Sequence, residues 1–185
     1  MDPSDPRRRF EAVYEAYYPA VQAYVRRRTD TADDTADALA ETFLTAWRRL
    51  ADIPDGDEAR LWLYGVARRV LANQRRGAAR RTALAERLRA ELVVRDGTTG
   101  RPVDPGQVGE AFGRLSDDDR ELLALIGWEG LTPAEASIVL GCSGGTVRIR
   151  LHRARKRLAR ELEAIGLDLS RFGHRAALLV EGKSS

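Results

Sequence analysis

The chain has 185 residues, and its 31 lysines and arginines against 28 aspartates and glutamates give a formal net charge of +3. This length suits one domain or two small ones. No apolar run approaches the length of a membrane span, and residues 1–9 lack the apolar segment of a signal peptide, so we expect a cytoplasmic protein. Cys142 is the single cysteine, which excludes an internal disulfide and a cysteine-rich metal site.

Two helices are predicted near the start of the chain. Apolar side chains recur at helical spacing from Phe10 to Arg28, although Pro19 should kink or divide that helix. After Asp30 a second helix should run to about Leu50. Its first turn is acidic, as the helix dipole favours. The predicted buried face of the second helix consists of Leu39, Phe43, Ala46, Trp47 and Leu50.

A loop rich in Asp, Pro and Gly, residues 52–57, precedes a third helix predicted from about Glu58 to Arg76. Residues 83–94 are also predicted to be helical. A stretch rich in glycine and proline then predicts a linker. We therefore expect an N-terminal domain over residues 1–94 and a linker over residues 95–109. The apolar stripe of the third helix consists of Leu63, Val66, Ala67 and Val70.

A helix-turn-helix is predicted from Leu131 to Arg160. A capping box begins at Thr132, followed by proline at the first helical position. Gly141 can end this short helix, because glycine adopts the left-handed conformation without steric cost. Ser143 then caps a second helix a few residues later. In this motif the second helix lies in the major groove of DNA.

The second helix of the motif has an apolar face and a cationic face. Val147, Leu151, Ala154 and Leu158 follow at i, i+4, i+7 and i+11, and should face the core. No acidic residue precedes Glu161 on this helix, so its cations repel one another unless a polyanion relieves the repulsion. We expect DNA to be contacted by Ser143, Gly145, Thr146, Arg148, Ile149, Arg150, His152, Arg153 and Arg157.

The predicted fold class is all-α, with two small helical domains joined by a flexible linker. The second domain should cover residues 110–165, contain the helix-turn-helix, and be followed by a tail over residues 166–185. A second group of arginines follows Arg68, so each domain carries its own basic surface. A protein that recognises one DNA site needs one basic surface. Two basic surfaces indicate a protein that binds at two sites.

The sequence resembles the sigma-70 family of bacterial RNA polymerase specificity subunits, in its extracytoplasmic-function class. Three motifs carry the resemblance: D-x-x-D-x-x-x-E-T-F-L-x-A-W from Asp34 to Trp47, W-L-Y-x-V-A-R from Trp62 to Arg68, and the helix-turn-helix motif from Leu131 to Leu158. They occur in the family's order and spacing. Together they extend the resemblance over roughly Phe10 to Leu162, apart from the linker.

The resemblance implies partners for the first domain. It implies that the helix from Asp34 to Arg48 binds the clamp helices of core RNA polymerase, and that this domain reads and melts the minus-ten promoter element. Ala40 stands where the family usually has Gln. The implied polymerase-binding residues are Asp34, Asp37, Ala40, Glu41, Leu44 and Arg48.

A minus-ten base held outside the stack requires a pocket and stacking surfaces. The loop before the third helix and the helix itself are the candidates for this pocket. Arg69 stands where the family commonly has Asn. The candidate minus-ten residues are Ile53, Asp55, Gly56, Arg68, Arg69, Asn73, Arg75 and Arg76.

The resemblance further implies that the second domain reads the minus-thirty-five element and contacts the polymerase flap. It allows an anti-sigma protein as a further partner. The implied protein has no chemistry of its own, so we expect no catalytic residues, no metal and no cofactor.

Two other classes of protein share parts of this pattern. A conventional helix-turn-helix regulator with a sensing domain would have a similar recognition helix, but it would usually dimerise, and no dedicated dimer helix is visible. An enzyme is the weakest alternative, because the chain has no nucleophile–base pair, phosphate loop or ligand cluster. Its two histidines, His152 and His174, lie among arginines. Co-purification with core polymerase separates the first interpretation from both others.

Overall fold

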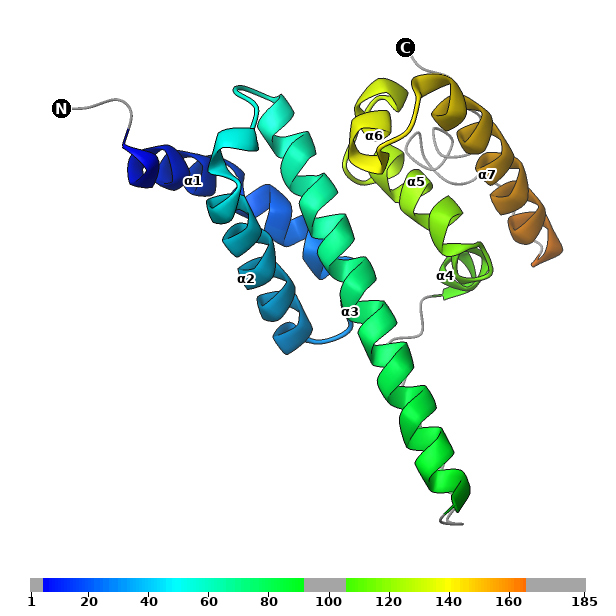
Figure 1. The fold of residues 1–185 in the computed structure, drawn as a ribbon. Coiled ribbons are helices and arrows are strands. Elements are labelled where there is room, and N and C mark those ends of the chain that lie inside the picture. Colours follow the sequence, from blue (N-terminus) through cyan, green and yellow to red (C-terminus); the bar gives the residue numbers. More distant parts are fainter. Residues whose placement is uncertain (1–4, 92–105, 166–185) are drawn as a thin grey trace. The chain divides into compact units, whose positions relative to one another are not determined.

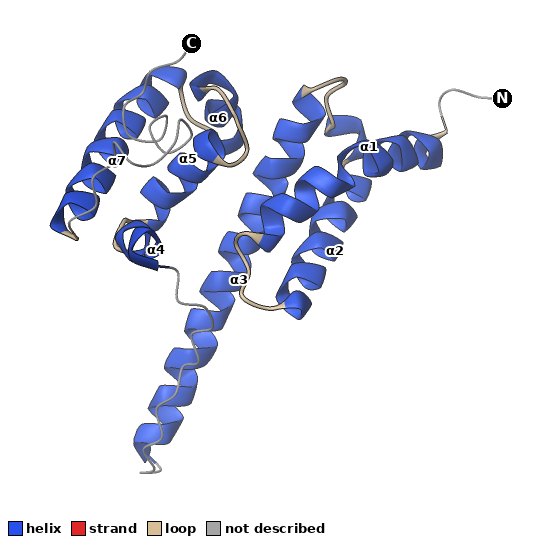
Figure 2. Ribbon diagram, turned by 180° about the vertical axis from the view of Figure 1, so that it is seen from behind, coloured by secondary structure: helices blue, strands red, loops and turns tan. Residues whose placement is uncertain are grey.

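The computed structural model describes residues 5–91 and 106–165. Within these ranges the chain forms seven α-helices and one short 3-10 helix, joined by loops and without strands (Figure 2). The chain divides into two compact units, one ending at Thr98 and the other beginning at Thr99. The prediction of an all-α fold with two helical domains is confirmed.

The first unit is a bundle of three helices, α1 (Pro6–Arg26), α2 (Ala32–Arg48) and α3 (Glu58–Glu91), with the 3-10 helix η1 (Leu50–Asp52) between the last two (Figure 1). Each of the three helices packs against the other two. The apolar stripe predicted for the third helix is buried in this bundle. The core side chains are Val21, Tyr24, Val25, Leu39, Phe43, Ala46, Leu63, Val66, Ala67 and Val70.

Helix α1 is continuous through Pro19, so the prediction that this proline could divide the helix is wrong. Proline at this position removes one hydrogen bond, the one that its N–H would have donated to the carbonyl of Glu15. Both residues are exposed, so water can replace the missing donor. The buried side of the helix, with Val21 and Tyr24 completely covered, retains its packing across the proline.

Helix α3 is longer than predicted, because the helix expected to end near Arg76 continues to Glu91 and passes beyond the end of α2 (Figure 1). The segment after Arg76 contains no proline, and its alanines and arginines favour helix. Gly77 alone costs only about 1 kcal/mol relative to alanine, which does not end a long helix. The two predicted helices are therefore one.

The second unit consists of α4 (Gly106–Gly113), α5 (Asp117–Gly127), α6 (Pro133–Leu140) and α7 (Gly144–Ala164). Helix α4 begins within the segment predicted as the linker; the rest of that linker and the predicted tail lie outside the described residues. Helix α7 packs against the other three helices. Its buried side chains are Val147, Leu151, Ala154, Leu158 and Leu162, which confirms the predicted stripe and extends it by one turn.

The predicted signals of the helix-turn-helix are all present. The Thr132 hydroxyl accepts a hydrogen bond from the Glu135 N–H at 3.2 Å, and a Glu135 carboxylate oxygen accepts one from the Thr132 N–H at 2.7 Å. Gly141 ends α6 at φ +65°, in the left-handed region. The Ser143 hydroxyl then accepts a hydrogen bond from the Thr146 N–H at 3.2 Å and starts α7.

Substitution of Leu151 by alanine should destabilise the second unit, because Leu151 is only 4% exposed and the change leaves a cavity. We expect the free energy of unfolding to fall by about 2–5 kcal/mol. The matched control is Ile149→Ala on the exposed face of the same helix, where the side chain is 56% exposed. It should cost less than about 0.5 kcal/mol. Urea denaturation followed by circular dichroism measures both, and equal losses would contradict the rotation of α7.

Candidate nucleic-acid and polymerase interfaces

The exposed face of α7 carries the side chains that were predicted to read DNA. Arg148, Ile149, His152 and Arg153 are all exposed, because they lie opposite the buried stripe. At the N-terminus of the helix Ser143, Gly145 and Thr146 are exposed as well. The positive end of the helix dipole and its first N–H groups also lie there, and this favours an anion. All seven residues are therefore accessible to a partner.

Carboxylates of α5 offset part of the charge of α7, which the sequence of α7 alone did not indicate. Arg150 Nη2 lies 3.0 Å from Asp118 Oδ2. Arg157 Nη1 contacts Asp119 Oδ2. Both aspartates belong to the acidic first turn of α5, which Ser116 caps and the helix dipole stabilises. Arg150 and Arg157, two of the residues predicted to contact DNA, thus form ion pairs within the unit.

The Arg157–Asp119 pair differs from an ordinary surface ion pair. The Asp119 side chain is only 7% exposed, whereas the Arg157 side chain is 54% exposed. A buried carboxylate requires a partner, because its hydration is lost. Arg157 therefore stabilises the buried Asp119 carboxylate. A DNA phosphate would have to compete with Asp119 for the Arg157 guanidinium. Partial burial also lowers the pKa of the neighbouring Arg155 guanidinium below its ordinary value.

The face of α2 that was predicted to bind polymerase is accessible over its whole length. Its six side chains are exposed, including the apolar Leu44, which is 42% exposed. Trp47 is 41% exposed, so its predicted burial is wrong. Its ring makes a T-shaped contact with Phe10 of α1, at a centroid distance of 5.3 Å. Exposed Leu44 and Trp47 add apolar area to an otherwise charged face.

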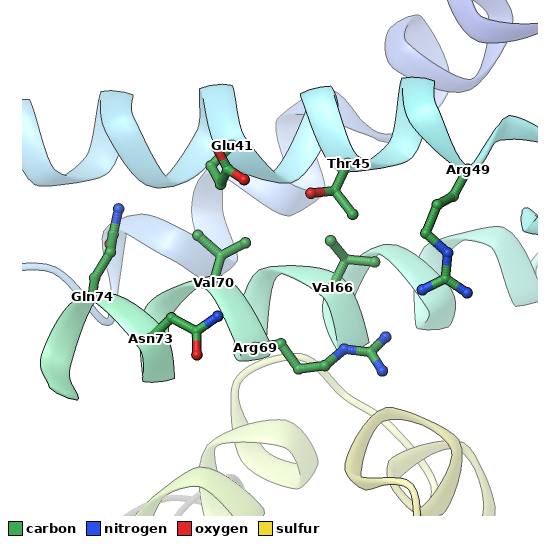
Figure 3. A pocket seen from close by; sticks show the side chains of 8 residues that line it. All are labelled: Glu41, Thr45, Arg49, Val66, Arg69, Val70, Asn73 and Gln74. Carbon is green, nitrogen blue, oxygen red and sulfur yellow. The ribbon is translucent and has the colours of Figure 1, made fainter. Parts of the chain in front are cut away.

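A groove of about 430 Å³ lies between α2 and α3 (Figure 3). Thr45 points from α2 toward α3, and Val66 and Val70 point back toward α2 (Figure 3). The polymerase-face residue Glu41 and two of the candidate minus-ten residues line this same groove. The complete lining is Glu41, Thr45, Arg49, Val66, Arg69, Val70, Asn73 and Gln74.

Most of the candidate minus-ten residues are accessible, but Ile53 is not. Its side chain is only 3% exposed and belongs to the core of the first unit, so it cannot contact DNA. The composition of the loop predicted a turn without showing that its one isoleucine anchors it. Arg68 is half-buried. The exposed members of the predicted set are Asp55, Gly56, Arg69, Asn73, Arg75 and Arg76.

Two residues of α1 contact this loop, and sequence reasoning missed both. Arg9 Nη2 donates a hydrogen bond to the Ile53 carbonyl at 2.8 Å. The Tyr17 hydroxyl donates one to the Gly56 carbonyl at 2.8 Å. Helical periodicity describes one helix at a time, so no signal in the sequence connects α1 with a loop that lies about 40 residues further along.

The chain combines a basic helix-turn-helix with a second accessible surface, on α2 and α3, in one all-α fold. These features define a DNA-binding protein with two interaction sites. Among the described residues, no group of three or more His, Cys, Asp or Glu side chains could hold a metal ion. The same part of the chain has no helix long and apolar enough to span a membrane.

Comparison with known proteins identifies the family. Residues 13–81 match sigma-70 region 2, and residues 106–158 match sigma-70 region 4. The chain is 33% identical over 157 residues to the ECF RNA polymerase sigma factor SigC of Mycobacterium tuberculosis, covering 84% of each chain. The chain therefore belongs to the sigma-70 family of RNA polymerase sigma factors, in its extracytoplasmic-function class.

Two solved structures share the fold. The sigma factor RpoE of Bartonella quintana, in complex with the anti-sigma factor NepR, has a TM-score of 0.62 and 26% identity, over 83% of this chain and 96% of that one. CnrH, in complex with the cytosolic domain of CnrY, has a TM-score of 0.59 and 26% identity, over 85% of this chain and 90% of that one. The family assignment decides between a sigma factor and a conventional helix-turn-helix regulator.

Replacement of Arg157 by alanine should destabilise the second unit, because the buried Asp119 carboxylate loses its partner. We expect a loss of about 1–3 kcal/mol in the free energy of unfolding. Adding Asp119→Asn should restore part of it, because an amide costs less to bury than a carboxylate. Arg153→Ala, on the exposed face, serves as the control and should cost under about 0.5 kcal/mol. If urea denaturation finds Arg157→Ala as stable as Arg153→Ala, the structural role of Arg157 is refuted.

Proposed function

We propose that this chain directs promoter-specific transcription initiation by binding core RNA polymerase and by reading the minus-ten element with its first unit and the minus-thirty-five element with its second. The observation that carries this proposal is the presence of two separate exposed surfaces, on α2–α3 and on α7, in a chain that matches sigma-70 regions 2 and 4 in order. Sigma factors are transcription initiation factors. We propose that the chain has no catalytic activity or cofactor of its own, and that it acts in the cytoplasm.

The α7 surface suits direct reading of base edges in the major groove. Arg148 and Arg153 can each donate two hydrogen bonds to a guanine, and Ile149 can contact a thymine methyl group. His152 lies between them on the exposed face. Ser143, Gly145 and Thr146 surround the N-terminus of α7, where a backbone phosphate would fix the register of the helix. Arg150 and Arg157 form ion pairs with Asp118 and Asp119 of α5.

The first unit offers a surface suited to single-stranded DNA. Arg69, Arg75 and Arg76 supply positive charge along α3, and Asn73 supplies hydrogen-bonding groups beside the groove. Asp55 and Gly56 lie at the exposed part of the loop before α3. Unstacked bases require positive charge for the backbone and polar groups for the base edges. We propose that the loop and α3 hold the melted minus-ten strand.

The exposed face of α2 is the proposed contact with the polymerase clamp. It combines carboxylates with exposed Leu44, and charged groups around an apolar centre are typical of protein interfaces. The second unit would contact the polymerase flap. Because the similar RpoE structure is a complex with the anti-sigma factor NepR, we propose that an anti-sigma protein binds this chain too.

We propose a division of the chain that follows these tasks. Residues 1–94 would form the domain that binds core polymerase and the minus-ten element, and residues 95–109 the connection. Residues 110–165 would form the minus-thirty-five domain, to which the structure adds helix α4 from Gly106 onward. Residues 166–185 remain a tail outside this scheme.

Charge reversal at Glu41 tests the polymerase contact. Glu41→Lys should weaken binding to core polymerase at least about tenfold, because an opposed charge pair in an interface contributes more than about 1.5 kcal/mol. The control Glu11→Lys changes an exposed carboxylate on α1 and should leave core affinity unchanged. Both variants should keep the unfolding free energy within about 0.5 kcal/mol. Fluorescence titration with labelled core measures the affinity. Failure of the unaltered chain to bind core at micromolar concentration would refute the proposed function.

Replacement of Arg148 by alanine tests the reading of DNA by α7. Loss of a bidentate contact should cost about 1–3 kcal/mol and relax the preference at one minus-thirty-five position. Lys156→Ala, about two turns further along the exposed side of α7, should leave every base preference intact. Transcription from promoters with each base at each minus-thirty-five position measures both. An unchanged preference in Arg148→Ala would mean that another side of α7 faces the bases.

A further inference from the structure

The loop of residues 53–57, between η1 and α3, is held by two side chains of α1. Arg9 Nη2 donates to the Ile53 carbonyl at 2.8 Å and lies 3.5 Å from Asp55 Oδ1. Tyr17 donates its hydroxyl proton to the Gly56 carbonyl at 2.8 Å. The two donors are about two turns apart on α1, so they lie on the same side of that helix. Together they contact the first part and the last part of the loop.

These contacts fix the backbone of the loop while leaving its centre accessible. Ile53 is buried and anchors one end. At the other end the Gly56 carbonyl also accepts a hydrogen bond from the Ala59 N–H at 3.0 Å, which ties the loop to the start of α3. Between them, the Asp55 side chain is fully exposed. Gly56 adopts φ +66°, which favours glycine, and no atom lies within 4 Å of the place where a Cβ would be.

The hydrogen bonds from α1 contribute little to the stability of the bundle itself. The Tyr17 hydroxyl bond is solvent-exposed; the bond from Arg9 to Ile53 is part-buried, but the Arg9 side chain is 42% exposed, so water has access to both donors. Their main effect is on the conformations available to the loop. A loop whose backbone is already fixed loses less conformational freedom when it binds a ligand.

We infer that Arg9 and Tyr17 are positioning residues that hold the loop of residues 53–57 in the conformation that binds an unstacked base of the minus-ten element. The inference rests on the proposed function and adds α1 to the parts of the chain that determine minus-ten recognition. Neither residue touches the base; each acts on the loop backbone through a carbonyl group.

The test uses the complex of the full chain with core polymerase. The probe is a fluorescent single-stranded oligonucleotide with the minus-ten sequence of a promoter selected by transcription from a random library. A second set of probes has an abasic nucleotide at each minus-ten position in turn. Tyr17→Phe removes one hydroxyl and keeps the ring. Its matched control is Tyr14→Phe on the same helix, because the Tyr14 ring packs against Phe43 and its hydroxyl has no hydrogen-bond partner within the described part of the chain.

Tyr17→Phe should bind the intact probe about three- to tenfold more weakly, because the loop is then less restrained in the free protein and loses more conformational freedom on binding. This loss should disappear with the probe that is abasic at the position held by the loop, because no base then remains to be positioned. Arg9→Ala should behave in the same way, and Arg9→Lys, which keeps a donor, should recover part of the affinity. Tyr14→Phe should match the unaltered chain, and all variants should bind core equally well.

Three results would overturn the inference. The first is an unaltered affinity for the intact probe in both Tyr17→Phe and Arg9→Ala. The second is an equal loss on every abasic probe, which would mean a general structural effect. The third is a parallel loss of core binding. If the unaltered chain itself fails to bind core, the proposed function fails and the inference with it; if it binds core and the probe normally while the variants match it, only the inference fails.

Discussion

In the second unit, the burial of one stripe of α7 determines what every other side chain of that helix can do. Val147, Leu151 and Leu158 must face α4, α5 and α6, because exposure of these side chains would cost about 1.5–3 kcal/mol each. Their burial fixes the rotation of the helix about its axis. Arg148 and Arg153 are exposed as a result, and they need no contact of their own to stay on the outer face.

The same rotation brings some cationic side chains of α7 into ion pairs with α5. Arg150 and Arg157 come within reach of the acidic first turn of α5, and both form ion pairs there. A helix with this many arginines would repel itself and bind any polyanion. The aspartates of α5 reduce that general attraction. We propose that this pairing favours specific over non-specific binding, because the residues proposed to read base edges lie outside these two ion pairs.

In the first unit, the two proposed binding faces lie on neighbouring helices, α2 and α3. The groove between α2 and α3 is lined by Glu41, on the proposed polymerase face, and by Arg69 and Asn73, on the proposed DNA face (Figure 3). A partner that contacts α2 at Glu41 would therefore lie beside a groove that the proposed minus-ten residues Arg69 and Asn73 also line. We propose that polymerase binding prepares the minus-ten surface through this groove, since the two proposed faces line its opposite sides.

Much of this could be predicted from the sequence, because the signals are local. The capping box at Thr132, the stop at Gly141 and the stripe of α7 each depend on residues within a few turns of one another. Contacts between elements could not be predicted in this way. Asp119 reaches Arg157 from another helix, and Tyr17 reaches Gly56 across the bundle. The burial of Ile53 was missed for the same reason, since a loop pattern does not show which residue points inward.

The most direct measurement is run-off transcription by core polymerase with and without the full chain on a library of random promoter sequences. The account predicts transcripts only when the chain is present, from templates that share two short sequence motifs at a constant separation. A chain that binds one DNA motif by itself and adds nothing to transcription by core polymerase would contradict it.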